Sequence, residues 1–236
     1  MTRTQAVFLC ELTGFVNPAI ARRLQDRGAA VTGADPALPE DGDHEGVPVL
    51  GWASPATLIR RAAERMGRLD AAIISPAMPA PRTPVEEIDA DTLRPYFERI
   101  AIASLAFAAE AAKVMRAQKS GRIIFGSSAG PIGGIPGAAP YAAARAAVNG
   151  AVRTLALELA ADNITVNAVA ANFIQTETYY PKALLDDPAK REKLLGKVPA
   201  RRLGDAEEVA ELVEFLALGR ATFLTGQVIP IAGGWC

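Results

Sequence analysis

The stretch RIIFGSSAGPIGGIPGAAPYAAARAAVNGAVRTLALELA, residues 122–160, decides the fold of this 236-residue chain. It begins with an apolar run at 122–126, continues through a loop rich in glycine and proline, and ends in an alanine-rich segment at 141–160 that favours a helix. A second apolar run follows at 164–169. Strand, helix and strand in this order predict a βαβ unit, which joins parallel strands.

The same alternation extends in both directions along the chain. Further strands are expected at residues 6–12, 29–33, 47–50, 70–75 and 227–231, and further helices at 18–27, 55–66, 92–118 and 206–218. The strands are short and almost wholly apolar, which is typical of a parallel sheet covered by helices on both faces. Without an internal repeat or a linker, the chain is expected to form one doubly wound, Rossmann-like α/β domain, residues 1–236. Ligands bind such sheets beyond the carboxyl ends of the strands.

Composition argues against several classes of function. The formal net charge is −1, whereas a nucleic-acid-binding protein needs a basic surface. No apolar run is long enough to span a bilayer, and the short run before Glu11 is typical of a first strand rather than of a signal peptide. The two cysteines, Cys10 and Cys236, make no disulfide framework. We therefore expect a cytoplasmic protein with no nucleic-acid partner and no membrane association.

A metal site and a serine–histidine–aspartate triad are not expected either. His44 is the only histidine, and it lies in the acidic, turn-rich stretch PEDGDHEG at 39–46, which indicates a solvated loop. Zinc would need mostly carboxylate ligands, which is unusual. A histidine in a flexible loop is also poorly placed to activate a nucleophile.

Tyr141 and Arg145 are the most informative pair in the chain. Their spacing of four places them on one face of a helix, one turn apart. A tyrosine is a poor base at neutral pH because its reference pKa is about 10, but a fixed positive charge beside it favours the phenolate. Such a tyrosine can take a proton from an alcohol. Ser128, just after the 122–126 strand, is placed to hydrogen-bond the same oxygen, with Ser127 as the alternative.

Ser128, Tyr141 and Arg145 together resemble the Ser…Tyr-x-x-x-Lys triad of the short-chain dehydrogenase/reductases, with arginine in the lysine position. Within that superfamily, the combination looks like that of the halohydrin dehalogenases, relatives that lost the nicotinamide cofactor. The segments RRLGDAEEVA at 201–210, LTGQV at 224–228 and AGGW at 232–235 also resemble the superfamily. The general likeness therefore covers nearly the whole chain.

The loop after the first strand departs from the nicotinamide-dependent relatives. They carry Gly-x-x-x-Gly-x-Gly there, whereas this chain reads LTGFVNPAI at 12–20, where Gly14 remains and Phe15 and Val16 add bulk. Asn17 before Pro18 is expected to cap the next helix. The superfamily's Asn-Ala-Gly after the fourth strand and its helical asparagine are also missing, at 75–77 and 98–104. We therefore expect no cofactor. The alternative is that the glycine motif has diverged in sequence but still binds a nicotinamide cofactor.

After the 164–169 strand, the resemblance implies a halide site. The superfamily usually continues Pro-Gly, but this chain reads AANFIQTETYYP at 170–181. In halohydrin dehalogenases an asparagine, backbone N–H groups and aromatic rings hold the halide about where the nicotinamide would lie. Carried over, the halide-binding candidates are Phe15, Ala171, Asn172, Phe173 and Ile174, with Tyr179 or Tyr180 as a further wall.

The resemblance implies a cofactor-independent carbon–halide lyase that closes vicinal halohydrins to epoxides with release of halide. Tyr141 is the expected base, Arg145 lowers its pKa, and Ser128 orients the substrate oxygen. The reverse reaction opens epoxides with small anions such as halide, cyanide, azide or nitrite. The alternatives are an atypical NAD(P)H-dependent short-chain reductase and a non-catalytic subunit. The superfamily also implies a homotetramer built through the helices at 92–118 and 141–160.

Overall fold

The computed structural model describes residues 3–38, 40–177 and 179–236. Its strands are β1 (Ala6–Cys10), β2 (Ala30–Ala34), β3 (Gly42–His44), β4 (Val47–Leu50), β5 (Ala71–Ile74), β6 (Gly121–Ser128), β7 (Ile164–Ala171) and β8 (Val228–Ile231). They form one sheet in the order β3-β4-β2-β1-β5-β6-β7-β8. Neighbouring strands are parallel except for β3 and β4, which are antiparallel.

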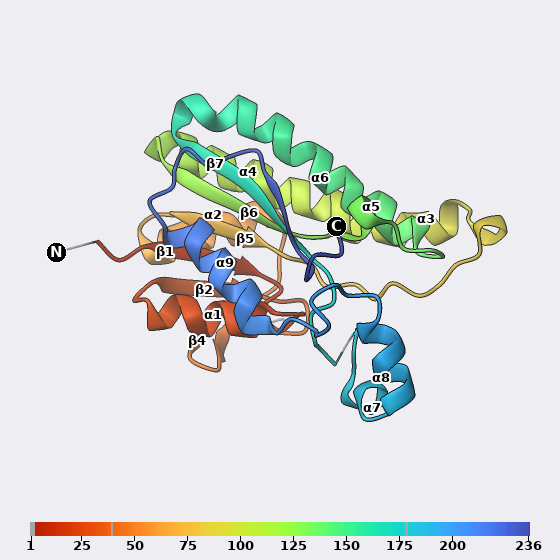
Figure 1. Ribbon diagram of the computed structural model, residues 1–236. Coiled ribbons are helices and arrows are strands. Elements are labelled where there is room, and N and C mark those ends of the chain that lie inside the picture. Colours follow the sequence, from red (N-terminus) through yellow and green to blue (C-terminus); the bar gives the residue numbers. More distant parts are fainter. Residues whose placement is uncertain (1–2, 39, 178) are drawn as a thin grey trace.

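Helices cover both faces of this sheet (Figure 1). The α-helices of the described residues are α1 (Asn17–Asp26), α2 (Pro55–Met66), α3 (Ala90–Tyr96), α4 (Ala103–Gln118), α5 (Gly130–Gly133), α6 (Ala139–Leu159), α7 (Lys182–Leu185), α8 (Pro188–Leu195) and α9 (Ala206–Leu218). The apolar residues of α2, α4 and α6 pack on one face of the sheet, and those of α1 and α9 pack on the other. The fold class expected from the sequence, a doubly wound Rossmann-like sheet, is confirmed. Within the described ranges, every helix is too short or too polar to cross a membrane.

Two strands are longer than expected, and their extra residues lie at the edge of the sheet where a ligand is expected to bind. β6 runs to Ser128 and β7 runs to Ala171, and these two residues are register partners at the ends of the pair. The strand β7 is buried along its whole length. The carboxyl ends of β1, β5, β6 and β7 therefore lie side by side at one edge of the sheet (Figure 1).

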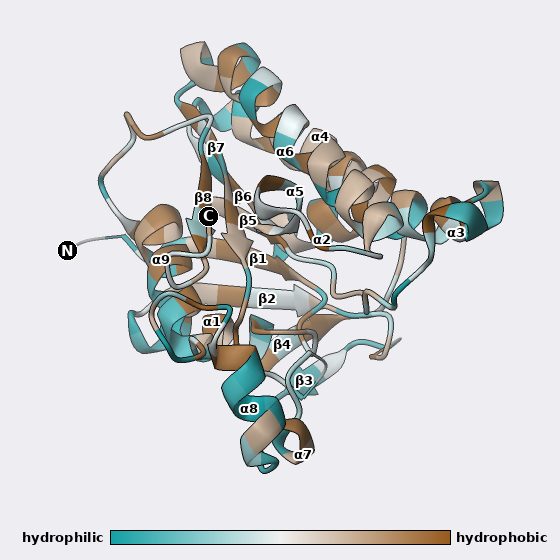
Figure 2. Ribbon diagram, turned by 45° about the vertical axis from the view of Figure 1, so that its right-hand side comes forward, coloured by the Kyte–Doolittle hydropathy of each residue, from teal (hydrophilic) through white to brown (hydrophobic). Residues whose placement is uncertain are grey.

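Several local expectations were wrong. Residues 42–44, expected in a solvated loop around His44, form the edge strand β3 instead, because they pair with β4. The short helices α7 and α8 were not expected; they lie beyond the edge of the sheet, and α8 is largely hydrophilic (Figure 2). The 92–118 helix is interrupted by a π-helical turn at Phe97–Ile102 that follows Pro95. Met1, Thr2, Pro39 and Thr178, which the expected domain and segments include, lie outside the described residues.

Asn17 does not cap α1, contrary to the sequence expectation. Val16 occupies the cap position without a side-chain bond, and Asn17 is the first residue of the helix. The Asn17 side chain is fully buried, and its Nδ2 lies 3.2 Å, 2.7 Å and 3.2 Å from the carbonyl oxygens of Cys10, Glu11 and Ser75. It therefore joins the ends of β1 and β5 instead of satisfying the start of its own helix.

Candidate active site

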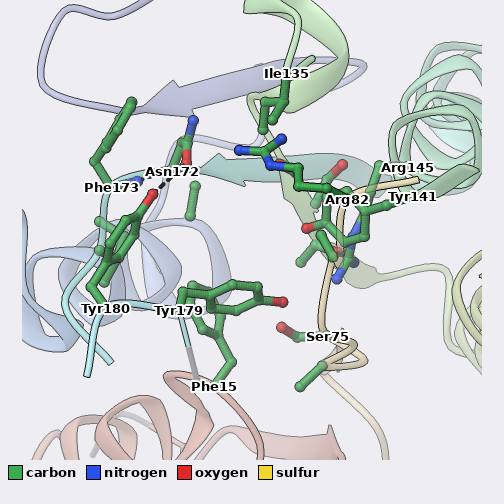
Figure 3. Close-up of a pocket in the computed structure, with 17 residues that line it drawn as sticks. Phe15, Ser75, Arg82, Ile135, Tyr141, Arg145, Asn172, Phe173, Tyr179 and Tyr180 are labelled. Carbon is green, nitrogen blue, oxygen red and sulfur yellow. Dashed lines mark hydrogen bonds between the residues drawn. The ribbon is translucent and has the colours of Figure 1, made fainter. Parts of the chain in front are cut away.

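A cavity of about 210 Å³ lies at the carboxyl ends of the central strands (Figure 3). The loops that follow parallel strands converge at this edge of the sheet. The cavity is lined by all eight site residues selected from the sequence: Phe15, Ser128, Tyr141, Arg145, Ala171, Asn172, Phe173 and Ile174. The β1–α1 loop, the end of β6, the start of α6 and the segment at the end of β7 thus meet around one cavity.

Tyr141 and Arg145 lie in the first two turns of α6 and face this cavity. Both are buried, with 7% and 4% of their surface exposed. The guanidinium carbon Cζ of Arg145 lies 5.2 Å from the centre of the Tyr141 ring. Its Nη1 donates to the carbonyl oxygen of Gly126 at 2.9 Å, and its Nη2 donates to that of Pro76 at 2.7 Å. Neutral backbone groups hold the guanidinium, so its charge is not cancelled by a carboxylate among the described residues.

The pKa of Tyr141 is lowered from its ordinary value, even though burial by itself raises it. The positive charge of Arg145 and hydrogen bonding with Ser128, Arg145 and Tyr179 outweigh the cost of burial. Tyr179 behaves in the opposite way: burial and the negative charge of an ionised Tyr141 raise its pKa. Its hydroxyl donates to the carbonyl oxygen of Met78 at 2.7 Å. The site therefore contains one tyrosine suited to act as a base and one that stays protonated, with its proton donated to the Met78 carbonyl.

The two serines at the end of β6 are engaged differently. The Ser127 hydroxyl donates to Oδ1 of Asn149 at 2.6 Å. The Ser128 oxygen accepts the backbone N–H of Gly130 at 3.0 Å, so the Ser128 hydroxyl keeps its own proton to donate. Because Ser127 is already committed to α6, the geometry favours Ser128 as the serine that binds a ligand oxygen.

The loop between β1 and α1 does not fit the nicotinamide dinucleotide that the fold implies. A pyrophosphate is normally bound by free backbone N–H groups at this helix start. Here the N–H of Thr13 donates to the Asp35 carboxylate at 2.7 Å, and those of Gly14 and Asn17 donate to carbonyls within the loop. The buried Glu11 carboxylate, at the start of the same loop, accepts the N–H of Ala77 at 3.1 Å and pairs with Arg99. The Asp35 carboxylate and carbonyls of the loop therefore occupy N–H groups that phosphates would need.

Phe15 also fills space in this loop. Its backbone is left-handed, with φ 48°, and its ring meets the Tyr179 ring edge-on with the centroids 5.5 Å apart. Figure 3 shows both rings together on one wall of the cavity. The place of the missing glycines is thus taken by an aromatic wall.

The segment after β7 forms the opposite wall. Oδ1 of Asn172 accepts the backbone N–H of Phe173 at 2.9 Å and the Tyr180 hydroxyl at 3.4 Å (Figure 3). The Asn172 amide N–H groups and the Ile174 backbone N–H have no hydrogen-bond partner within the part of the chain that the structure describes. Phe173, with φ 56°, packs against Tyr180 and Trp235. The wall combines unused N–H donors with ring edges, which suits a weakly hydrated anion.

Other residues of the cavity were not selected from the sequence. Ser75, Ile135 and Arg82 also line it, and Arg82 brings a second guanidinium to its rim. Arg82 lies between β5 and α3, in the stretch 79–84 that is expected from the sequence to contribute a lid over the pocket, but no sequence signal singles out Arg82 within it. Tyr179 and Tyr180 were expected only loosely as walls, and both line the cavity.

Comparisons with known proteins agree with this architecture. A family model described as enoyl-(acyl carrier protein) reductase matches residues 48–236. Dehydrogenase/reductase SDR family member 4 of Oryctolagus cuniculus is 45% identical over 82 residues, 35% of this chain and 31% of that protein. The 3-oxoacyl-[acyl-carrier-protein] reductase FabG of Escherichia coli (strain K12) is 39% identical over 123 residues, 52% and 48% of the two chains. The matches thus span less than half of these curated relatives.

The solved structures that resemble this chain include proteins named as dehalogenases as well as reductases. A structure described as a dehalogenation enzyme has a TM-score of 0.92 and 35% identity, and covers 99% of both chains. A halohydrin dehalogenase (HheC) bound to ethyl (2S)-oxiran-2-ylacetate has a TM-score of 0.90 and 28% identity, and covers 97% of this chain and 96% of that one. Levodione reductase has a TM-score of 0.85 and 25% identity, and covers 98% of both. By its sheet, its serine–tyrosine pair and the family model, the chain belongs to the short-chain dehydrogenase/reductase superfamily.

Proposed function

We propose that this chain is a halohydrin dehalogenase that works without a nicotinamide cofactor. One observation carries the proposal. Ser128, Tyr141 and Arg145 open onto a cavity whose walls, at the β1–α1 and post-β7 loops, are aromatic rings and N–H donors instead of a phosphate path. The likeness to the dehalogenation enzyme and to halohydrin dehalogenase over nearly the full chain supports the same activity.

In the proposed reaction, the Tyr141 phenolate takes the proton of the substrate hydroxyl. Ser128 donates a hydrogen bond to the same substrate oxygen and holds it toward Tyr141. The lowered pKa of Tyr141 makes its phenolate more accessible than that of an ordinary tyrosine, because the Arg145 charge stabilises it. The O–H bond is thus broken by a group that is already buried beside a fixed cation.

The alkoxide then displaces the halogen on the neighbouring carbon. The C–O bond of the epoxide forms while the carbon–halogen bond breaks, and the halogen leaves with the bonding electron pair as halide. Negative charge grows on the halogen in the transition state, so N–H donors of Asn172 and Ile174 and the edge of Phe15 lower the barrier. Tyr141 returns its proton to water, which leaves epoxide, halide and a proton as products. In reverse, the Tyr141 hydroxyl protonates an epoxide oxygen while a small anion opens the ring.

The test is halide release from a small vicinal chloro- or bromo-alcohol by purified protein with no nicotinamide added. Tyr141→Phe is expected to lower kcat/KM by about 10²–10⁴-fold, the usual contribution of a general base. Tyr96→Phe is the matched control, since it removes a hydroxyl from a tyrosine whose ring lies 6.3 Å from that of Tyr141 but outside the cavity lining. Tyr141→Phe retaining most of the activity would refute the assignment.

The second candidate is an NAD(P)H-dependent reductase, which the names of the curated relatives favour. A rise in melting temperature with excess NADH or NADPH, together with no halide release from several halohydrins, would select it. A non-catalytic role would be left if neither activity appeared.

A further inference from the structure

Arg82 brings an uncompensated positive charge to the mouth of the cavity. Its Nη1 donates to the carbonyl oxygen of Pro136 at 2.5 Å, and its aliphatic stem lies against Gly137. The neighbouring Thr83 N–H donates to the Gly137 carbonyl at 2.7 Å. These contacts fasten Arg82 to the same loop that leads from Ser128 to Tyr141. Figure 3 shows its guanidinium reaching into the opening between Asn172 and Tyr141.

Among the residues that the structure describes, no acidic side chain pairs with Arg82 to neutralise this charge. The lining residues of the cavity include two arginines and neither aspartate nor glutamate. Many other surface arginines of the molecule pair with carboxylates, as Arg23, Arg61 and Arg202 do, but Arg82 pairs with none within residues 3–38, 40–177 and 179–236. Its field does reach the cavity wall: burial raises the pKa of Tyr180 to about 12, and the Arg82 charge acts against that rise.

Arg82 is not needed to stabilise the Tyr141 phenolate, because that role belongs to Arg145. Arg145 is buried behind Tyr141, bonded to two carbonyls, and its charge stabilises the phenolate. The leaving halogen does not explain the positive charge of Arg82 either. A halogen bound to carbon carries no full charge when the substrate enters, and the Asn172 wall already supplies weak donors for the halide. A full positive charge that faces a ligand pocket and has no acidic partner in the protein best suits a ligand with a permanent negative charge.

We propose that the cavity takes halohydrins and epoxides that carry a carboxylate, which pairs with Arg82 while the hydroxyl lies at Ser128 and Tyr141 and the halogen at the Asn172 wall. This proposal rests on the proposed function and adds the substrate class to it. The carboxylate takes no part in bond making, so Arg82 stabilises the bound substrate and the transition state equally. The expected signature is therefore an effect on KM, with kcat little changed.

The experiment compares an acid with a neutral partner of the same shape. Halide release is measured with the purified full chain on 4-chloro-3-hydroxybutanoate and on 4-chloro-3-hydroxybutanamide. The acid is expected to have a kcat/KM at least about tenfold higher, the value of one charge-assisted hydrogen bond at a partly exposed site. This preference should fall as salt is raised, because screening weakens exposed charges.

Variants assign the preference to Arg82. Arg82→Gln should reduce the ratio of the two kcat/KM values about tenfold, through a higher KM for the acid, and Arg82→Lys should restore part of it. Arg94→Gln, an equal change of charge at an exposed site on α3 outside the cavity, should leave the ratio as in the parent. If kcat/KM is the same for the amide and the acid, or if Arg82→Gln lowers kcat/KM for both substrates by the same factor, the carboxylate assignment is wrong. The proposed dehalogenase activity still stands in either case. Release from a small vicinal chloro-alcohol but from neither of these substrates overturns the carboxylate assignment alone, and release from none of the three overturns both proposals.

Discussion

Removing the charge of Arg145 is the perturbation whose effect the structure sizes most directly. Its guanidinium carbon lies 5.2 Å from the Tyr141 ring centre. At that distance and an effective dielectric constant of about 20, a unit charge stabilises the phenolate by about 3 kcal/mol. This energy corresponds to a change on the order of 100-fold in the balance between phenol and phenolate. Arg145→Met, which keeps an unbranched stem of similar bulk but removes the charged guanidinium, should therefore raise the pKa of Tyr141.

The consequence appears as a shift of the pH profile. Because the phenolate is the active form, activity rises with pH through the Tyr141 pKa, and a raised pKa moves that limb to higher pH. In Arg145→Met, kcat/KM for halide release at pH 7 should fall on the order of 100-fold and recover as the pH is raised.

Arg145→Lys is the matched control, since it keeps the positive charge but not both hydrogen bonds to the Gly126 and Pro76 carbonyls. It should lie much closer to the parent profile. Melting temperatures identify any variant that has lost its fold. A folded Arg145→Met enzyme whose activity is lower by one factor at every pH would show that Arg145 only shapes the site, and the electrostatic reasoning would be wrong.

Two further predictions concern other parts of the site. Asn172→Ala removes the amide beside Phe173, so product inhibition by bromide in the halide-release assay should weaken several-fold, and unchanged inhibition would place the halide elsewhere. Gly126→Ala places a Cβ 2.1 Å from Oγ of Ser75 and should lower the free energy of unfolding by about 1–3 kcal/mol in denaturant titration. Gly150→Ala on α6, where a Cβ meets nothing within 4 Å, should instead raise it by about 0.5–1 kcal/mol; equal effects at both positions would contradict the packing argument.

The sequence predicted the architecture well because strong periodicity decides it. The strands at 47–50 and the helices at 55–66 and 206–218 have the bounds expected, since apolar runs and spacing define them locally. The meeting of Ser128, Tyr141 and Arg145 was also predictable, because strand end and helix start belong to one βαβ unit. Contacts between loops that are distant in the sequence were not predictable. The polar stretch at 42–44 becomes a strand only because β4 offers it an edge.

Arg82 and Asn17 show why the remaining parts of the site escaped prediction. Each acts through backbone carbonyls of distant segments: Arg82 through Pro136, and Asn17 through the ends of β1 and β5. Such bonds depend on where the chain passes and not on which side chains it carries, so no spacing of residue types signals them. An N-cap reading of Asn17 is reasonable locally, but a fully buried amide gains more from three carbonyls than from the start of one helix.

The contacts of Asn17 also explain how the first loop keeps its shape without phosphates to organise it. In a dinucleotide-binding relative, N–H groups at this helix start are satisfied by the ligand. Here Asn17 ties the strand ends from inside, Asp35 accepts the Thr13 N–H, and the loop turns back on itself through Gly14. With its backbone closed in this way, the loop can hold Phe15 in a left-handed conformation against Tyr179. On the proposed function, the same rearrangement that removes the phosphate path builds one wall of the halide pocket. Restoring a single glycine at position 15 would therefore widen the pocket without recreating a nucleotide site, because the internal bonds of Thr13, Gly14 and Asn17 would remain.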